Sequence, residues 1–424
     1  MSTKTYFSIG KKGKLAMAIL ATLSAGFFFP SLARASTSST DPITGDIKLT
    51  DDYSVNLSTG TGNYADGEGY STILTPKDDA TINIDMNGHN LNLTASSSSL
   101  DAYGATITQG GIWNVTNGKG KTITISTVGK DNANGINMLG TSIDVDANLH
   151  IVKAAGTNEA FGILADMGSK SVFKGDVTIE NVALEPDLYD GTYTSGIALL
   201  TSAGHDTSVT VQGKTTIKNS GDAVQVNGTG AVLTLGAASL SINDNSVTTD
   251  KKYKYHAVTN KFGTVYINVA RDGVTTGTTN IYGDIFSGST TKTYLALTDA
   301  DSTWVGSSDA NWGKDNVWHG TYLTLQNGAT FTNKSLSKDS THGLRKNWSG
   351  SFLNELTGGT SADKAGNIVM ENAGTDPLRI QKISGNTNIF YSHEDSTPAV
   401  FSNGNVLIDE ASKGANIRVI TASN

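Results

Sequence analysis

Short runs of alternating aliphatic and polar residues recur along most of the chain. In each run Val, Ile or Leu occupies every second position, and Thr, Asn, Ser or Asp fills most positions between them. Successive side chains of a β-strand point to opposite faces, so this period of two places the aliphatic residues on one buried face. The pattern predicts a long series of short strands and no convincing helix after residue 36. The clearest predicted strands are 81–85, 90–94, 122–126, 142–146, 176–180, 208–212, 223–227, 232–236, 264–268, 279–282 and 322–326.

The segments between these strands favour a solenoid. Gly, Asn and Asp recur there and supply turn residues that tolerate positive φ. Only 6 of the 424 residues are proline, which fits a ladder of central strands because proline removes a backbone donor. Strands spaced by roughly 8 to 12 residues, with mostly one inward aliphatic face, predict an all-β parallel β-helix whose coils share a core. A set of antiparallel β-sandwiches is the alternative.

The first 35 residues have the three parts of a secretory signal peptide. Four lysines and no acid precede an apolar run over 15–29, and the small residues Ala33 and Ala35 mark the cleavage site. A transmembrane anchor is the alternative, but the run is shorter than the roughly 20 residues that a membrane-spanning helix needs. We therefore expect a signal peptide over 1–35 and a mature β-helical region over 36–424, one elongated domain without a transmembrane helix.

Charge and cysteine content exclude several classes of protein. The chain has no cysteine, which excludes a disulfide scaffold, a cysteine-ligated zinc site and a cysteine nucleophile. Removal of residues 1–35 takes away five of the 31 bases and none of the 39 acids, which leaves 26 bases against 39 acids and a net charge of −13. Nucleic-acid binders normally carry a basic field, so nucleic acid is not an expected partner.

Two later parts of the chain carry motifs of a known family. One is Asp-Ala-Asp-Ser-Thr-Trp-Val-Gly over 299–306, followed after an insert by Tyr-Leu-Thr-Leu-Gln-Asn-Gly-Ala-Thr-Phe-Thr-Asn over 322–333. The other covers 384–391, 404–408 and 414–421. With the export signal and the Thr/Asn/Gly-rich strands, these motifs resemble the passenger region of Gram-negative autotransporters (type V secretion) of the pertactin and adhesin type. The resemblance covers most of the mature region and implies a right-handed parallel β-helix that is exposed at the cell surface and usually adhesive.

The resemblance also implies a partner and a location. Members of the family continue into a carboxy-terminal translocator barrel, which is built from alternating segments of roughly 10 residues with aromatic girdles. The sequence up to Asn424 contains no such series, so we expect an outer-membrane translocator barrel as a partner outside this sequence. The expected route is export through the inner membrane to the outer-membrane cell surface or beyond it, with retention in the periplasm as the alternative for a chain without a barrel.

Tryptophans mark a candidate contact loop. Four of the five tryptophans fall in a Trp-rich coil and insert over 299–350. Within the insert 307–319, Trp312 and Trp318 are the candidate ligand-binding residues, because exposed aromatic rings contact sugars and proteins. Packing of the tryptophans inside wider coils is the alternative reading.

A basic run and a cap complete the expected organisation. A short basic and aromatic run interrupts an otherwise acidic chain, and its lysines Lys251, Lys252 and Lys254 are candidates for binding an anionic glycan. The alternative is a solvated loop between coils. The ends of a solenoid must be protected from edge pairing, so residues 36–80 are expected to form an N-terminal cap. The expected function is that of an adhesin or structural surface protein that presents loops to a host-cell or glycan receptor.

Candidate catalytic groups are sparse. Asp144 and Asp146 lie two residues apart on one strand face, but the aliphatic residues beside them take the inward positions and leave both acids in solvent. The His-acid runs at 205–206 and 393–395 place neighbours on opposite faces, so neither is a preformed ligand set. We expect no catalytic residue, no cofactor, no metal site and no enzymatic activity. A β-helical polysaccharide lyase or hydrolase is the alternative function.

Overall fold

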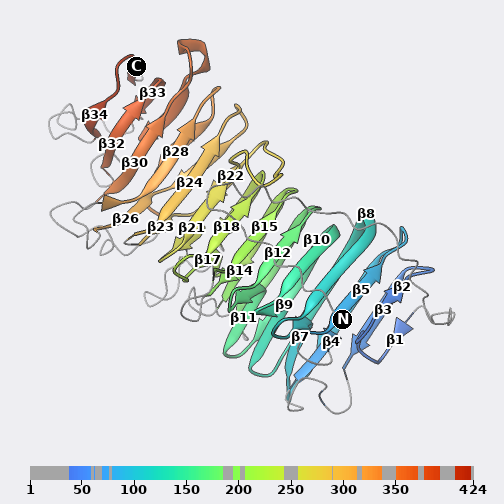
Figure 1. Ribbon diagram of the computed structural model, residues 1–424. Coiled ribbons are helices and arrows are strands. Elements are labelled where there is room, and N and C mark those ends of the chain that lie inside the picture. Colours follow the sequence, from blue (N-terminus) through green and yellow to red (C-terminus); the bar gives the residue numbers. More distant parts are fainter. Residues whose placement is uncertain are drawn as a thin grey trace, which may run out of the picture. The chain divides into compact units, whose positions relative to one another are not determined.

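The structure is a computed structural model (Figure 1). The chain divides into two units, Met1–Ala35 and Ser36–Asn424. The first unit, with the predicted signal peptide, lies outside the described residues, and the fold is that of the second. The described residues are 38–58, 62, 69–75, 79–184, 194–200, 206–242, 256–288, 290–312, 318–336, 350–370, 377–391 and 406–421.

The strands of the second unit stack in three parallel ladders. One sheet, sheet A, contains ladders 1 and 2, and a second sheet forms ladder 3. Through most of the unit, each coil of the chain passes through ladder 1, ladder 2 and ladder 3 in turn. The long strands β8 (Ile112–Val128) and β10 (Ser142–Gly156) run through both ladders of sheet A, whereas other coils use two separate strands.

The strands of each ladder follow one another in stacking order. Ladder 1 consists of β2 (Ile47–Lys48), β5 (Thr81–Asp85), the first parts of β8 and β10, β12 (Lys170–Phe173), β15 (Ser208–Val211), β18 (Val232–Leu235), β21 (Thr264–Ile267), β24 (Lys292–Leu297), β28 (Thr321–Leu325), β30 (Ser351–Thr357), β32 (Leu378–Ser384) and β34 (Val406–Ala411). Ladder 2 consists of β1 (Ser38–Ser39), β3 (Tyr53–Leu57), β6 (Leu91–Ser96), the second parts of β8 and β10, β13 (Val177–Leu184), β16 (Thr215–Ser220), β19 (Ala238–Ile242), β22 (Asn280–Tyr282), β25 (Thr303–Gly306), β29 (Thr330–Asn333), β31 (Gly366–Met370), β33 (Asn386–Tyr391) and β35 (Asn416–Thr421). Ladder 3 consists of β4 (Gly69–Leu74), β7 (Asp101–Ile107), β9 (Asn132–Leu139), β11 (Glu159–Asp166), β14 (Thr194–Leu199), β17 (Asp222–Val226), β20 (Val258–Asn260), β23 (Ile285–Ser287) and β26 (Ser308–Trp312).

This pairing confirms the predicted all-β parallel β-helix. All strand pairs within the three ladders are parallel, and the one antiparallel pair among the described strands joins β26 to β27 (Trp318–His319). Each of the eleven segments predicted from alternation overlaps a strand, with at most one of its residues outside that strand; the segment 81–85 coincides with β5. The one helical element in the described part of the chain is a short 3-10 turn, η1 (Ala362–Lys364).

Columns of aliphatic side chains fill the space between the ladders. The column from ladder 2 stacks one side chain per coil, because partners in neighbouring strands lie in register. A column of glycines on ladder 3 faces it: a Cβ at Gly162 would lie 2.6 Å from the Ile179 side chain, and one at Gly196 would lie 2.5 Å from Ile217. Glycine therefore lets ladder 3 approach the core closely. The ladder 2 column runs through Ile125, Ile151, Ile179, Ile217, Leu240, Ile281, Trp304, Phe331, Ile368 and Ile389.

The outer faces of the two sheets differ in burial. Strands of sheet A such as β5 and β15 alternate between buried and more accessible residues, as the sequence predicts. Strands β14 and β17 of ladder 3 are buried at every residue. The outer face of ladder 3 carries a second, small hydrophobic cluster of Phe161, Leu164 and Ala198, separate from the main core. The expectation of one inward face therefore holds for sheet A but not for ladder 3.

Candidate functional site

The predicted contact insert forms a β-hairpin at the edge of ladder 3. Residues Ser308 to Ala310 of β26 pair in parallel with β23. The next two residues leave the ladder and pair with β27 in the antiparallel direction, which places Trp312 directly opposite Trp318. The structure thus brings the two candidate ligand-binding tryptophans together in register. The turn between them, 313–317, lies outside the described residues.

Other aromatic residues of this region belong to the core. Trp304 is fully buried and stacks on Phe331 with ring centroids 4.3 Å apart. Its indole Nε1 donates a hydrogen bond to the Gly283 carbonyl at 3.0 Å, so its polar atom is satisfied inside the coil. The packing interpretation is therefore correct for Trp304, while Trp348 lies outside the described residues.

The basic candidates Lys251, Lys252 and Lys254 lie outside the described residues. The described chain resumes at His256, the last residue of the same basic and aromatic run. His256 is 5% exposed, and its backbone N–H donates to the Asp222 carboxylate at 2.8 Å. The end of this run is therefore buried against ladder 3.

A buried histidine and carboxylates meet beside the hairpin, and the sequence analysis did not predict this cluster. The His256 ring has its Nδ1 4.0 Å from Asp222 on β17 and its Nε2 3.6 Å from Asp309 on β26. The Thr259 hydroxyl lies 3.2 Å from Nδ1. Asp309 belongs to the strand that continues into the hairpin, so the cluster links the base of the hairpin to two earlier coils.

A third carboxylate, that of the buried Asp284, also acts on the His256 ring. Its oxygens accept backbone N–H groups from Ser307 at 2.7 Å and from Leu336 at 3.1 Å. These hydrogen bonds connect the residue before β26, Ser307, with the segment after β29 that contains Leu336. Asp284 therefore fixes backbone near the hairpin, as buried carboxylates do when they accept N–H donors.

Burial and neighbouring charge set the protonation of the cluster. Burial raises the pKa of Asp222 to about 6, against the lowering influence of the His256 charge and of hydrogen bonds from Thr259 and His256. Burial alone would lower the pKa of His256, but the Asp309 carboxylate beside its ring and the charges of Asp222, Asp309 and Asp284 outweigh it and raise that pKa. Asp222 and His256 therefore retain their protons more strongly than the same groups in water. No group of three or more His, Asp or Glu side chains among the described residues is arranged to hold a metal ion.

The carboxylate pair considered from the sequence faces solvent. Ile143 and Val145 are buried in the core, and Asp144 lies outside with half of its side chain exposed. Lys174 from the next coil pairs with Asp144 at 2.7 Å. This arrangement is an exposed ion pair between coils, as expected for the outer face of sheet A.

No known protein family, curated protein or solved structure matches this chain. Among the described residues, no helix has the length and apolar character needed to cross a membrane.

Proposed function

We propose that the chain is an exported surface scaffold of the autotransporter passenger kind that binds a host-cell or glycan receptor through the hairpin β26–β27. The observation that supports this function is the register of Trp312 with Trp318 in the one strand pair that departs from the parallel ladders. Tryptophan side chains supply large contact areas at binding sites. Contact residues on loops that a rigid scaffold positions are a common arrangement of binding proteins.

The scaffold supports binding that adds up over several weak contacts. Parallel strands in register hold side chains in fixed rows, so the strands that flank an inserted loop have defined positions. The basic run of Lys251, Lys252 and Lys254 precedes β20, and β20 pairs with β23, which pairs with β26. A receptor that contacts both the hairpin and this run gains affinity through effective concentration. In this proposal the predicted signal peptide provides export and a translocator barrel outside this sequence provides surface delivery.

Binding by the purified mature region, residues 36–424, tests the proposal. We expect saturable binding to host cells or to a glycan array, and at least about a tenfold loss of affinity when Trp312→Ala and Trp318→Ala are combined, a loss of about 1.4 kcal/mol. Phe262→Ala is the matched control, because Phe262 is an exposed aromatic residue (48%) that belongs to neither strand of the hairpin. Circular dichroism must show the same strand content in all three proteins.

Two results would contradict the proposal. One is unchanged binding by the double tryptophan variant with its fold intact. The other is turnover of pectin or alginate by the purified protein, which would favour the alternative function of a polysaccharide lyase or hydrolase.

A further inference from the structure

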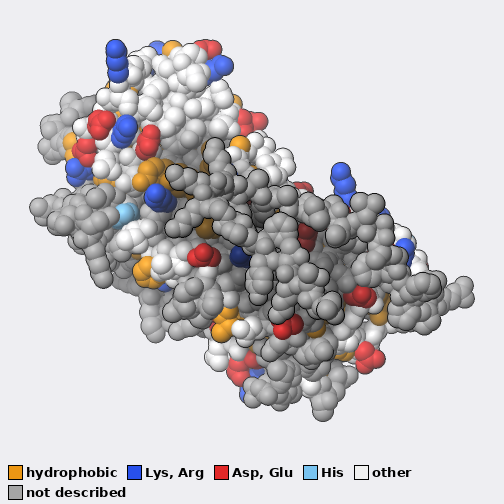
Figure 2. All heavy atoms as spheres, viewed as in Figure 1, with side chains coloured by type: hydrophobic (Ala, Val, Ile, Leu, Met, Phe, Trp, Pro, Cys, Tyr) orange, Lys and Arg blue, Asp and Glu red, His pale blue; other side chains and the backbone are white. Residues whose placement is uncertain are grey.

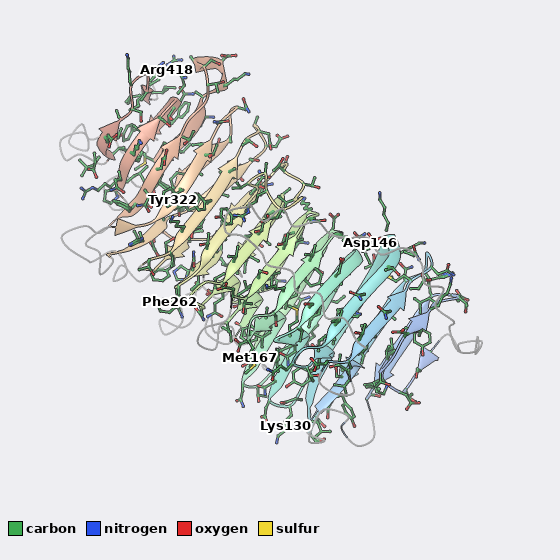
Figure 3. The ribbon with its side chains drawn as sticks, in the orientation of Figure 1. Lys130, Asp146, Met167, Phe262, Tyr322 and Arg418 are labelled. Carbon is green, nitrogen blue, oxygen red and sulfur yellow. The ribbon has the colours of Figure 1, made fainter. Side chains whose placement is uncertain are left out.

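A row of three tyrosines runs along the outer face of ladder 1. Tyr266 on β21 is in register with Tyr294 on β24, and Tyr294 is in register with Tyr322 on β28. The ring centroids are 5.0 Å apart in the first pair, with nearly parallel planes, and 4.9 Å apart in the second. Each coil thus adds one ring. Figure 3 labels Tyr322 among the strands of sheet A.

The core does not depend on these rings. Their strand neighbours Val265, Leu295 and Leu323 are the residues that point inward and are buried. The tyrosines are only partly buried, and within the described part of the chain the hydroxyls of Tyr294 and Tyr322 make no hydrogen bond. Tyr266 and Tyr294 are stacked and Tyr294 and Tyr322 are tilted by 31°, and rings at this spacing overlap only in part. The row therefore presents ring edges and hydroxyl groups to the solvent at each coil.

Charged side chains bound the row without giving it a net charge. The Arg271 guanidinium carbon lies 3.8 Å from the centroid of the Tyr266 ring, and its Nε pairs with Asp272 at 2.6 Å. Lys292 precedes Tyr294 by two residues and so points to the same outer face. Glu355 follows Tyr322 in register on the next coil. Two cations and two anions thus surround the three rings.

The chemistry of the row favours a neutral linear sugar polymer. The hydroxyls of a pyranose can bond to the phenol hydroxyls of the row, and its C–H groups can contact the ring edges. The coil repeat is close to the length that one sugar unit adds to an extended 1,4-linked chain, so such a polymer along the stack meets equivalent groups at every coil. The balanced charges, and the excess of 39 acids over 31 bases in the chain, disfavour a polyanion. Figure 2 shows acidic and basic side chains interspersed over the face in view, rather than a patch of one sign.

We propose that Tyr266, Tyr294 and Tyr322 form a binding surface for a neutral, linear, 1,4-linked glycan that lies along the stacking direction of the coils. This surface is on ladder 1, whereas the hairpin of the proposed function continues ladder 3. Trp318 precedes Tyr322 by four residues, so the variants described below, rather than distance, distinguish the two sites.

Calorimetric titration of the mature region with cellohexaose tests the surface. We expect saturable binding, and about a tenfold loss of affinity in Tyr294→Ala. Tyr294→Phe keeps the ring and removes only the hydroxyl, so its loss should be smaller. The matched control is Tyr282→Ala, because Tyr282 is an exposed tyrosine (39%) of ladder 2 outside the row, and it should bind as the unmodified protein does. Should Tyr294→Ala fail to fold, Tyr294→Phe and Tyr322→Phe provide the comparison.

Three outcomes would overturn the tyrosine surface. They are equal affinity of Tyr294→Ala and Tyr282→Ala, preference for oligogalacturonate over cellohexaose, and no binding of any neutral linear glycan by the unmodified protein. The Trp312→Ala, Trp318→Ala double variant separates the two proposals, since it should retain cellohexaose binding. Loss of cellohexaose binding in that variant with no loss in Tyr294→Ala would assign the sugar to the hairpin instead.

Discussion

The outer face of sheet A and the outer face of ladder 3 use the same parallel pairing, yet their side chains have opposite surroundings. On sheet A, β12 and β15 bury every second residue and leave the residues between them more accessible. On ladder 3, β14 and β17 are buried throughout, and polar residues such as Asp222 are enclosed. The same parallel pairing therefore builds both sheets, whereas the burial of each outer face determines which side chains remain available for recognition.

The protein has an aromatic stack inside the coils and another on their outer face. Trp304 and Phe331 stack inside the coil, and Tyr266 and Tyr294 stack outside it. We expect Trp304→Ala to lower the free energy of unfolding by about 3–5 kcal/mol, because it leaves a large cavity in a packed core. Tyr294→Ala should cost about 1 kcal/mol, the scale of an aromatic pair without full burial.

Denaturant unfolding followed by far-UV circular dichroism measures both changes. Tyr282→Ala serves as the control for loss of an exposed ring. Equal destabilisation by Trp304→Ala and Tyr294→Ala would show that the inner and outer stacks contribute equally to the free energy of unfolding. That result would contradict the expected difference between the core and the outer face.

The acid–histidine cluster predicts a pH dependence of stability opposite in direction to that of Glu180 on the outer face of sheet A, whose pKa is lowered by the hydrogen bond from Lys218. The folded state raises the pKa of Asp222 to about 6 from an ordinary 3.8, so its proton stabilises the fold below pH 3.8 and that contribution is lost as pH rises through 6. The raised pKa of His256 acts in the same direction: its contribution is complete below 6.5 and is lost above the folded value. A shift of about 2 units corresponds to about 3 kcal/mol at most.

The variant Asp222→Asn isolates this effect from the other carboxylates. It removes the titrating group and keeps an oxygen for the His256 backbone N–H. Between pH 4 and pH 7, we expect the unmodified protein to lose stability relative to Asp222→Asn, as measured by paired denaturant titrations at each pH. Lys261, whose charge lowers the pKa of Asp222, is unchanged in both proteins. A constant difference between the two proteins across that range would contradict the predicted proton linkage.

The sequence predicted the strands of sheet A well because their burial alternates. The segment 81–85 became β5 without a change of boundary. In ladder 3 the alternation pattern of the sequence predicted the strand over 223–227, but it did not predict β11 or β14. In those strands outward residues such as Phe161 and Leu164 are also buried, so no period of two remains.

The candidate sites were predictable to different degrees. The pairing of Trp312 with Trp318 follows from one hairpin, so nearness in sequence indicated the site. The cluster of Asp222, His256 and Asp309 depends on coil lengths, which vary: the stacked residues Val224, Val258, Ile285 and Ser308 are 34, 27 and 23 positions apart. No fixed spacing reveals such contacts.

The tyrosine row was predictable from the sequence, but from the spacing of the tyrosines and not from the alternation of aliphatic and polar residues. Tyr266, Tyr294 and Tyr322 recur at an interval of 28 residues, and each stands directly before an aliphatic residue of a predicted or observed strand. An equal interval between identical residues in a solenoid indicates that they stack, because one coil separates them.

We expect the smallest loss of stability from removal of an ion pair on the outer face of sheet A. Glu180 on ladder 2 pairs with Lys218 at 3.1 Å and with His150 at 3.3 Å, one residue from each of three successive coils. Half of the Lys218 side chain is exposed, so water and salt screen the pair, and Lys218→Ala should cost only about 0.2–1 kcal/mol. That cost should shrink further when unfolding is repeated in high salt. A loss comparable to that of Trp304→Ala would mean that side chains on the outer face of sheet A carry the stability of the coils, and the contrast between the two faces would no longer hold.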